Sequence, residues 1–214
     1  MKRIINILIC LMLVITAFSL TVYAGDENNP EILDLENDIT GKLIKNPILF
    51  KILQTINMVP FQSFEFIDIT SAWFYESEGK PDYLFSIIKI KDLDYTSLRT
   101  IYAIRWTFDE KNYGAGCHIH SNDEFRWSAA GQIYGLLDNW AYKIGLIKDI
   151  SDCIIDYEKN LIILKIPKNI IGDPNPGDVL SYTNAWAGLR FISEIGGDLV
   201  EDLTSYGDNY IIQY

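Results

Sequence analysis

The sequence predicts an all-β protein, an antiparallel β-sandwich of the immunoglobulin or jelly-roll type with a short N-terminal helix. Three observations lead to this fold class. Apolar and polar residues alternate in several segments, turn residues separate those segments, and helical periodicity is confined to one stretch near the amino terminus. The chain has 214 residues, of which 49% are apolar and 13% aromatic. That content is enough for a buried core and excludes a disordered chain.

Acidic residues outnumber basic residues. The chain contains 29 Asp and Glu against 18 Lys and Arg, which gives a formal net charge of −11. Nucleic-acid binding needs clustered Lys and Arg to neutralise phosphates. The charge balance therefore argues against a nucleic-acid partner.

Residues 1–24 have the pattern of a secretory signal peptide. Lys2 and Arg3 precede an almost wholly apolar run over residues 4–20, and small Ala24 stands at a position that signal peptidase reads. We therefore expect cleavage after Ala24 and a secreted or cell-surface protein. The alternative is an uncleaved membrane anchor, because the apolar run is just long enough to span a bilayer.

Residues 25–60 are expected to form an acidic N-terminal segment with one short helix. Asn46 can cap a helix, Pro47 suits its first turn, and apolar residues recur at helical spacing. These apolar residues are Ile48, Leu49, Ile52, Leu53 and Ile56. We expect the helix over residues 46–59, ending before Pro60.

Residues 61–214 are expected to form the β-sandwich domain. The strands should lie where aromatic and β-branched residues are frequent and alternate with polar ones. The expected strands are 64–75, 83–93, 101–108, 140–146, 153–157, 161–166, 179–191 and 209–214. Alternation places Ile162, Leu164 and Ile166 on the inner face.

Turn residues and core tryptophans complete this prediction. Turns are expected at 78–81 and 158–160, the second of which would connect a hairpin. Trp106 and Trp140 share a face with other large apolar residues, so both are expected in the core. The glycines of 114–116 are interpreted as turn or bulge residues.

Two cysteines, Cys117 and Cys153, follow the signal peptide. Outside the cell, a cysteine pair in strand-like segments is typical of a disulfide. We therefore expect a disulfide between them. The alternative is a pair of buried thiols.

Several short stretches resemble one class of secreted β-sandwich module in their order and spacing. They are DLEND at 34–38, IDITSAW at 67–73, DYLF at 82–85, IKDL at 90–93, IY at 101–102 before Trp106, IPKNIIG at 166–172 and PGDVL at 176–180. Together they resemble the sandwich shared by DOMON-type domains and family-nine carbohydrate-binding modules, found in surface proteins and exported enzymes of archaea and bacteria. The resemblance implies a non-catalytic module that binds a sugar, a haem-like cofactor or another surface. The chain departs from it in the helix-like insert and in lacking a Met/His pair placed for haem.

Three tryptophans are candidates for a sugar-binding platform. Trp73, Trp127 and Trp186 stand among residues of mixed polarity. Flat aromatic rings stack on the apolar faces of sugars, while neighbouring polar groups fix the orientation. The alternative is that these side chains pack within the sandwich.

An acidic run near the amino terminus is a candidate calcium site. Asp34, Glu36 and Asp38 alternate, so an extended segment would place their carboxylates on one side. Calcium takes about 6–8 oxygen ligands from carboxylates, carbonyls and water. We expect a structural calcium ion here, with Asp178 as a remote ligand. The alternative is a solvated acidic linker.

His118 and His120 form a second candidate metal site, this time for a transition metal. The two residues would leave one face of a strand, Cys117 is adjacent, and Asp123 and Glu124 follow shortly after. The alternative is a pair of surface histidines near a loop.

The sequence contains no nucleophile elbow, phosphate-binding glycine loop or metalloprotease helix motif. We therefore expect a binding protein rather than an enzyme. The leading hypothesis is an exported module that binds carbohydrate or a cell-surface polymer, with calcium as a structural ion. One alternative is a structural or adhesive cell-envelope protein that recognises another protein. The other is a metal-dependent enzyme that uses the two histidines.

Overall fold

The computed structural model describes residues 25–35, 38–40, 48, 51, 55, 64–93, 99–119, 126–133, 148–149, 153–190 and 200–214. These residues form twelve β-strands and a short 3₁₀-helix, η2. The elements are β1 (Ile32–Leu33), β2 (Ile69–Tyr75), β3 (Tyr83–Ile90), β4 (Arg99–Phe108), β5 (Lys111–Ile119), β6 (Arg126–Gln132), β7 (Lys148–Asp149), β8 (Cys153–Asp156), β9 (Leu161–Pro167), η2 (Lys168–Ile170), β10 (Val179–Arg190), β11 (Val200–Leu203) and β12 (Tyr210–Ile211).

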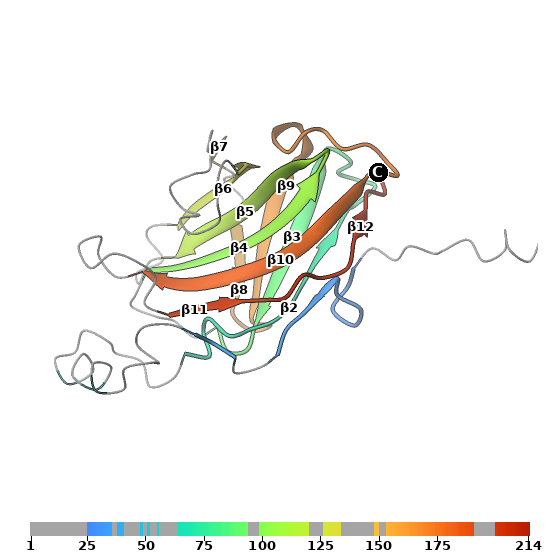
Figure 1. Ribbon diagram of the computed structural model, residues 1–214. Coiled ribbons are helices and arrows are strands. Elements are labelled where there is room, and N and C mark those ends of the chain that lie inside the picture. Colours follow the sequence, from blue (N-terminus) through green and yellow to red (C-terminus); the bar gives the residue numbers. More distant parts are fainter. Residues whose placement is uncertain are drawn as a thin grey trace, which may run out of the picture.

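The strands form two antiparallel sheets that pack face to face (Figure 1). Sheet A has five strands in the order β1-β2-β3-β9-β8. Sheet B has seven strands, β11-β10-β4-β5-β6-β7, with β12 paired to the beginning of β10. The predicted fold class, an antiparallel β-sandwich, is therefore confirmed.

Two hairpins show how local sequence forms the strands. β8 and β9 pair as the sequence predicts, and Asn160 in their turn has a φ of +59°. Between β4 and β5, Asp109 and Glu110 have φ values of +48° and +60°. Positive φ at both central residues is the geometry that matches the twist of a two-residue hairpin.

The interpretation of residues 114–116 as turn or bulge glycines is wrong. Gly114 and Gly116 lie in the middle of β5, where they pair with Arg105 and Ala103 of β4. They sit in the outward-facing positions of the strand, whereas Tyr113, Ala115 and Cys117 belong to the core. An apolar inner face is sufficient to bury this strand although two of its outward positions lack side chains.

The core lies between the two sheets and follows the alternation of the sequence. Ile162, Leu164 and Ile166 are fully buried in it, as predicted. From sheet B, Trp106 projects into the core and is 1% exposed. The ring of Phe74 on β2 meets Trp106 edge to face at 5.5 Å, which is a favoured aromatic geometry and joins the two layers.

Cys117 and Cys153 are thiols in the structure and form no disulfide. Cys117 lies in the core on β5 of sheet B, and half-buried Cys153 packs against the same core from β8 of sheet A. A cysteine among apolar side chains behaves as a small hydrophobic residue. The expected disulfide is therefore replaced by its alternative, two thiols that contribute to packing.

Several predicted segments lie outside the described residues. They include the signal peptide over 1–24, the strand over 140–146 with Trp140, and most of the helix over 46–59. Among the residues that are described, there is no helix with the length and apolarity needed to cross a membrane.

Replacing Phe74 by Ala tests the contact between the sheets. The variant should lose about 3–5 kcal/mol of unfolding free energy, because a large buried ring leaves a cavity. Urea unfolding followed by circular dichroism measures this loss. Leu33→Ala is the control, since Leu33 is 67% exposed and should change stability by less than about 0.5 kcal/mol. Equal effects of the two substitutions would contradict the described packing.

Candidate functional site

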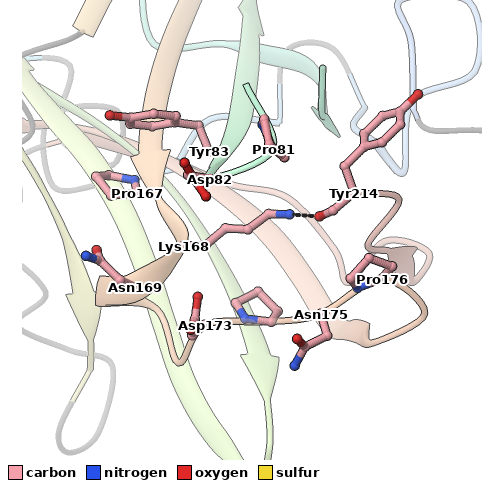
Figure 2. A pocket seen from close by; sticks show the side chains of 11 residues that line it. Pro81, Asp82, Tyr83, Pro167, Lys168, Asn169, Asp173, Asn175, Pro176 and Tyr214 are labelled. Atoms are coloured by element: carbon pink, nitrogen blue, oxygen red, sulfur yellow. Dashed lines mark hydrogen bonds between the residues drawn. The ribbon is translucent and has the colours of Figure 1, made fainter. Parts of the chain in front are cut away.

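A pocket of about 460 Å³ opens at one end of the sandwich (Figure 2). It is built from the turn before β3, the end of β9, η2, the loop before β10 and the last residue of the sequence. Its lining residues are Pro81, Asp82, Tyr83, Pro167, Lys168, Asn169, Asp173, Pro174, Asn175, Pro176 and Tyr214. Four separate chain segments thus converge on one hollow.

Backbone hydrogen bonds fix the walls of this pocket. The Lys168 N–H donates to the Asp82 carbonyl oxygen at 2.9 Å, which joins η2 to the turn before β3. The Asp173 N–H donates to the Lys168 carbonyl oxygen at 2.9 Å. The Asn175 N–H donates to Oδ2 of Asp178 at 2.7 Å, so Asp178 closes its own turn.

Gly172 allows the loop to pass close to the core. Its φ is +92°, and a Cβ at this position would lie 2.7 Å from the Tyr113 hydroxyl oxygen. The next residue, Asp173, also has a left-handed backbone with a φ of +53°. A glycine followed by an Asp in this conformation turns the chain sharply from η2 toward the pocket wall.

The pocket combines rings with polar side chains. Figure 2 shows Tyr83 and Tyr214 on opposite sides of Lys168. Asn169, Asp173 and Asn175 lie below Lys168 in this view. Tyr214 is 44% exposed. The Lys165 ammonium lies 4.3 Å from the centre of the Tyr83 ring and covers one of its faces.

A buried ion pair supports the floor of the pocket. Lys168 Nζ lies 2.5 Å from Oε1 of Glu76, and their side chains are 5% and 0% exposed. The same ammonium donates to the Tyr214 carbonyl oxygen. Oε2 of Glu76 accepts from the Tyr210 hydroxyl at 3.0 Å and from the Gln213 N–H at 2.6 Å. Burial and the charge of Glu76 raise the pKa of Tyr210 far above its usual value, so the phenol stays a donor.

Three carboxylates meet at the opposite end of the sandwich. Asp34, Asp38 and Asp202 each place an oxygen within 4.8 Å of the other two, and we call this group the acidic cluster. Asp34 follows β1, and Asp202 lies on β11. The sequence predicts Asp34 and Asp38 as neighbours but gives no sign of Asp202.

The local environment disfavours ionisation of two members of the acidic cluster. Burial, with added repulsion from Asp34, Asp38 and Asp68, raises the pKa of Asp202 to about 8. Burial and the charge of Asp38 raise the pKa of Asp34 to about 6. Both shifts are those of carboxylates that lack compensating positive charge.

Of the other two predicted calcium ligands, the structure describes only Asp178, which lies away from the cluster. Asp178 precedes β10 at the pocket end, whereas Asp202 pairs with Ala187 toward the other end of that strand. Strand β10 therefore separates the two carboxylates, and the prediction of Asp178 as a ligand is wrong. Glu36 lies outside the described residues.

The structure does not assemble the predicted tryptophan platform. Trp73 is 4% exposed and packs with Ile87 and Leu161 on the outer face of sheet A. Trp186 is 7% exposed, and its indole lies over Gly188, where a Cβ would collide with the ring. Its Nε1 donates to Glu201 at 3.3 Å. The side chain of Trp127 is outside the described part of the chain.

The predicted histidine site is only partly visible. His118 lies on β5, pairs with the backbone of Trp127 and is half-buried. His120 is not among the described residues. Within the described ranges, His118 belongs to no group of metal ligands, so a transition-metal site stays a prediction.

A buried polar pair on the outer face of sheet B was not predicted. Arg105 of β4 pairs across the strands with Asn184 of β10, and they are 7% and 6% exposed. Nε of Arg105 and Oδ1 of Asn184 have no hydrogen-bond partner among the described residues. Burial lowers the pKa of Arg105, although the nearby Tyr206 and Glu201 oppose this shift. The pair is buried on the face of a sheet, whereas the pocket offers a volume of about 460 Å³, so the pocket is the stronger candidate site.

Substituting Glu76 by Gln tests the support of the pocket. The change leaves the Lys168 ammonium buried without its anion, which should lower the free energy of unfolding by about 3–5 kcal/mol. Denaturant unfolding measures the effect. Glu78→Gln, an exposed change in the neighbouring turn, should be nearly silent. Full stability of Glu76→Gln would show that the ion pair is dispensable.

A pH series on the chelator-treated chain tests the acidic cluster. Asp202 titrates near pH 8 in the fold and near pH 4 when unfolded. Between these values the folded state holds a proton that the unfolded state has lost. The protonated Asp202 therefore contributes to the free energy of unfolding at low pH, and this contribution is lost as pH rises through about 8. The unfolding free energy of the unsubstituted chain should therefore fall relative to that of Asp202→Asn between about pH 5 and 9. A difference that stays constant with pH would contradict the raised pKa.

Comparisons with known proteins give no relative for this chain. No family model matches it, and neither the curated proteins nor the solved structures contain a match. The fold and the two sites therefore rest on the geometry given above.

Proposed function

We propose that this chain is an exported, non-catalytic module that binds a saccharide chain of a polysaccharide or cell-surface polymer in the pocket of Figure 2. The observation that carries the proposal is the lining of the pocket, which combines two tyrosines with Asp and Asn side chains. Export is supported by the signal-peptide pattern of residues 1–24.

The chemistry of the lining suits a sugar. Tyrosine and proline rings offer flat apolar surfaces to the C–H groups of a pyranose, while carboxylates and amides accept and donate hydrogen bonds to its hydroxyls. Ligand pockets commonly measure about 300–1,000 Å³, and this one has about 460 Å³. Tyr214 in this lining is 44% exposed, so its surface is accessible to a longer saccharide chain.

The support beneath the pocket favours binding without large rearrangement. Lys168 is held by Glu76 and by the Tyr214 carbonyl oxygen, so η2 and the last residue of the sequence are tied together before a ligand arrives. A preorganised wall reduces the entropy lost on binding. Loops on a rigid sandwich are a common location for such sites.

A second function, recognition of another protein, is favoured by one exposed patch. Tyr182 and Tyr206 are 66% and 64% exposed and meet edge to face at 5.9 Å. Leu203 on β11 is also exposed. Exposed aromatic residues are frequent in protein interfaces. The third hypothesis, a metal-dependent enzyme, has support only from the spacing of His118 and His120.

Two pocket variants and one patch variant separate these functions. A glycan array on the purified chain selects the saccharide, and isothermal titration measures its affinity. Tyr214→Ala should weaken binding about tenfold or more through loss of ring stacking. Asp173→Asn keeps the left-handed backbone and should also weaken binding, because it removes a charged acceptor. Tyr206→Ala should leave affinity unchanged.

Two outcomes would overturn the saccharide proposal. One is the absence of binding to every polysaccharide on the array. The other is equal loss for Tyr206→Ala and Tyr214→Ala, which would move the site to the exposed tyrosine patch and support protein recognition.

A further inference from the structure

The acidic cluster lies where the edges of the two sheets come together. The Asp34 N–H donates to the Thr70 carbonyl oxygen of β2 at 3.2 Å, which attaches this residue to sheet A. A few residues later, Thr40 exchanges two 2.8 Å backbone hydrogen bonds with Glu201 of β11, which attaches the same segment to sheet B. Asp38 lies between these two attachments. The segment after β1 thus passes from one sheet to the other directly beside Asp202.

Asp202 itself connects the two sheets. It is on β11 of sheet B, yet its Oδ2 accepts the Ile69 N–H of β2 in sheet A at 2.6 Å. The residue is 2% exposed, so its position is fixed by packing as well as by this bond. A buried side chain of this kind provides a rigid ligand.

Buried carboxylate oxygens remain unsatisfied in the cluster. Oδ1 of Asp202 and Oδ2 of Asp34 are inaccessible to solvent and accept no hydrogen bond from the residues that the structure describes. A buried acceptor without a donor is costly, and it is costlier when the group carries a charge. These two oxygens therefore call for a shared proton or a metal cation.

The surrounding charge adds to this requirement. Asp68 precedes β2, is fully buried and adds its repulsion to that of Asp34 and Asp202. In the described part of the chain, Lys91 is a nearby cation, and its Nζ lies 3.6 Å from Asp68 and 3.4 Å from Glu65. Lys91 therefore forms ion pairs with acidic groups beside the cluster. The oxygens of the three cluster carboxylates lie close to one another instead.

We propose that the acidic cluster binds one Ca²⁺ ion through Asp34, Asp38 and Asp202. The ion ties the segment after β1 to β11 and thereby fastens the edges of the two sheets together. This site is separate from the saccharide pocket, because the two lie at opposite ends of β10. It does not depend on the proposed function.

Calcium fits these ligands better than other common ions. Carboxylate oxygens are hard ligands, and Ca²⁺ accepts them in flexible geometry at about 2.3–2.6 Å, so oxygens across the ion can be separated by about 5 Å. The cluster oxygens lie within 4.8 Å of one another. Mg²⁺ requires a tighter octahedron at about 2.0–2.1 Å and keeps most of its water. The cluster contains no thiolate or imidazole, which zinc prefers.

Calcium titration of the chelator-treated full chain tests the proposal. Isothermal titration should show one ion per chain, and thermal unfolding should shift upward with CaCl₂ concentration, as expected for a ligand that binds only the folded state. MgCl₂ at the same concentrations should give a much smaller shift. Hydrogen exchange of the amides of Asp34 and Thr40 should slow when calcium is added, because the ion restrains their segment.

Two substitutions and a control locate the ion. Asp38→Asn changes an exposed residue and leaves the fold intact, yet it should weaken calcium affinity tenfold or more. Asp202→Asn keeps the bond from Ile69, so the calcium-free variant should be as stable as the unsubstituted chain or more stable, but it should lose the calcium-induced shift. Asp178→Asn is the matched control and should bind calcium normally. The proposal is overturned if calcium gives no heat and no thermal shift, or if Asp178→Asn weakens binding as much as Asp38→Asn.

Discussion

The apolar inner faces of sheets A and B pack against each other, and this contact determines where both candidate sites lie. Because side chains alternate along each strand, residues in the middle of a strand face either the core or an outer face of the sandwich. Contacts such as that of Phe74 on Trp106 hold the layers together. The strand ends and sheet edges are then the places where several segments can bring polar groups together. The pocket lies at one end, and the acidic cluster lies at the other.

Alternation in the sequence is sufficient to predict most of this fold. It gives β4, β9 and the inner position of Trp106, since the inward residues of each of these strands are large and apolar. It fails for β5, where Gly114 and Gly116 remove the side chains of the outer face. It also fails to place Trp73, because the outer face of sheet A is itself apolar around Ile87. A tryptophan on such a face packs against its neighbours although it lies outside the core.

The sites are harder to predict than the strands because their residues are distant in sequence. The spacing of Asp34 and Asp38 suggests a metal site, but Asp202 joins them only because β11 pairs with the far end of β10. Asp178 precedes the other end of β10, so the strand order keeps it away from Asp34 and Asp38. The pocket likewise needs Tyr83, Lys168 and Tyr214 to meet, which follows from the topology of both sheets. The run Pro174-Asn175-Pro176-Gly177 was a usable signal for a rigid loop at this end.

Buried carboxylates are compensated within the chain at the pocket end of the sandwich but not in the acidic cluster. This difference suggests different roles for the two sites. At the pocket end, Glu76 has Lys168 as a cation and two hydrogen-bond donors, so its charge is compensated within the chain. The charges at this end are therefore balanced without a ligand, and the fold does not need a bound saccharide for its stability. At the other end, Asp202 has one backbone donor and two acidic neighbours. Since buried acceptors without a partner oppose folding, the proposed cation would stabilise the fold itself. Removal of the proposed ion should therefore weaken the sandwich first and affect the pocket only through that loss.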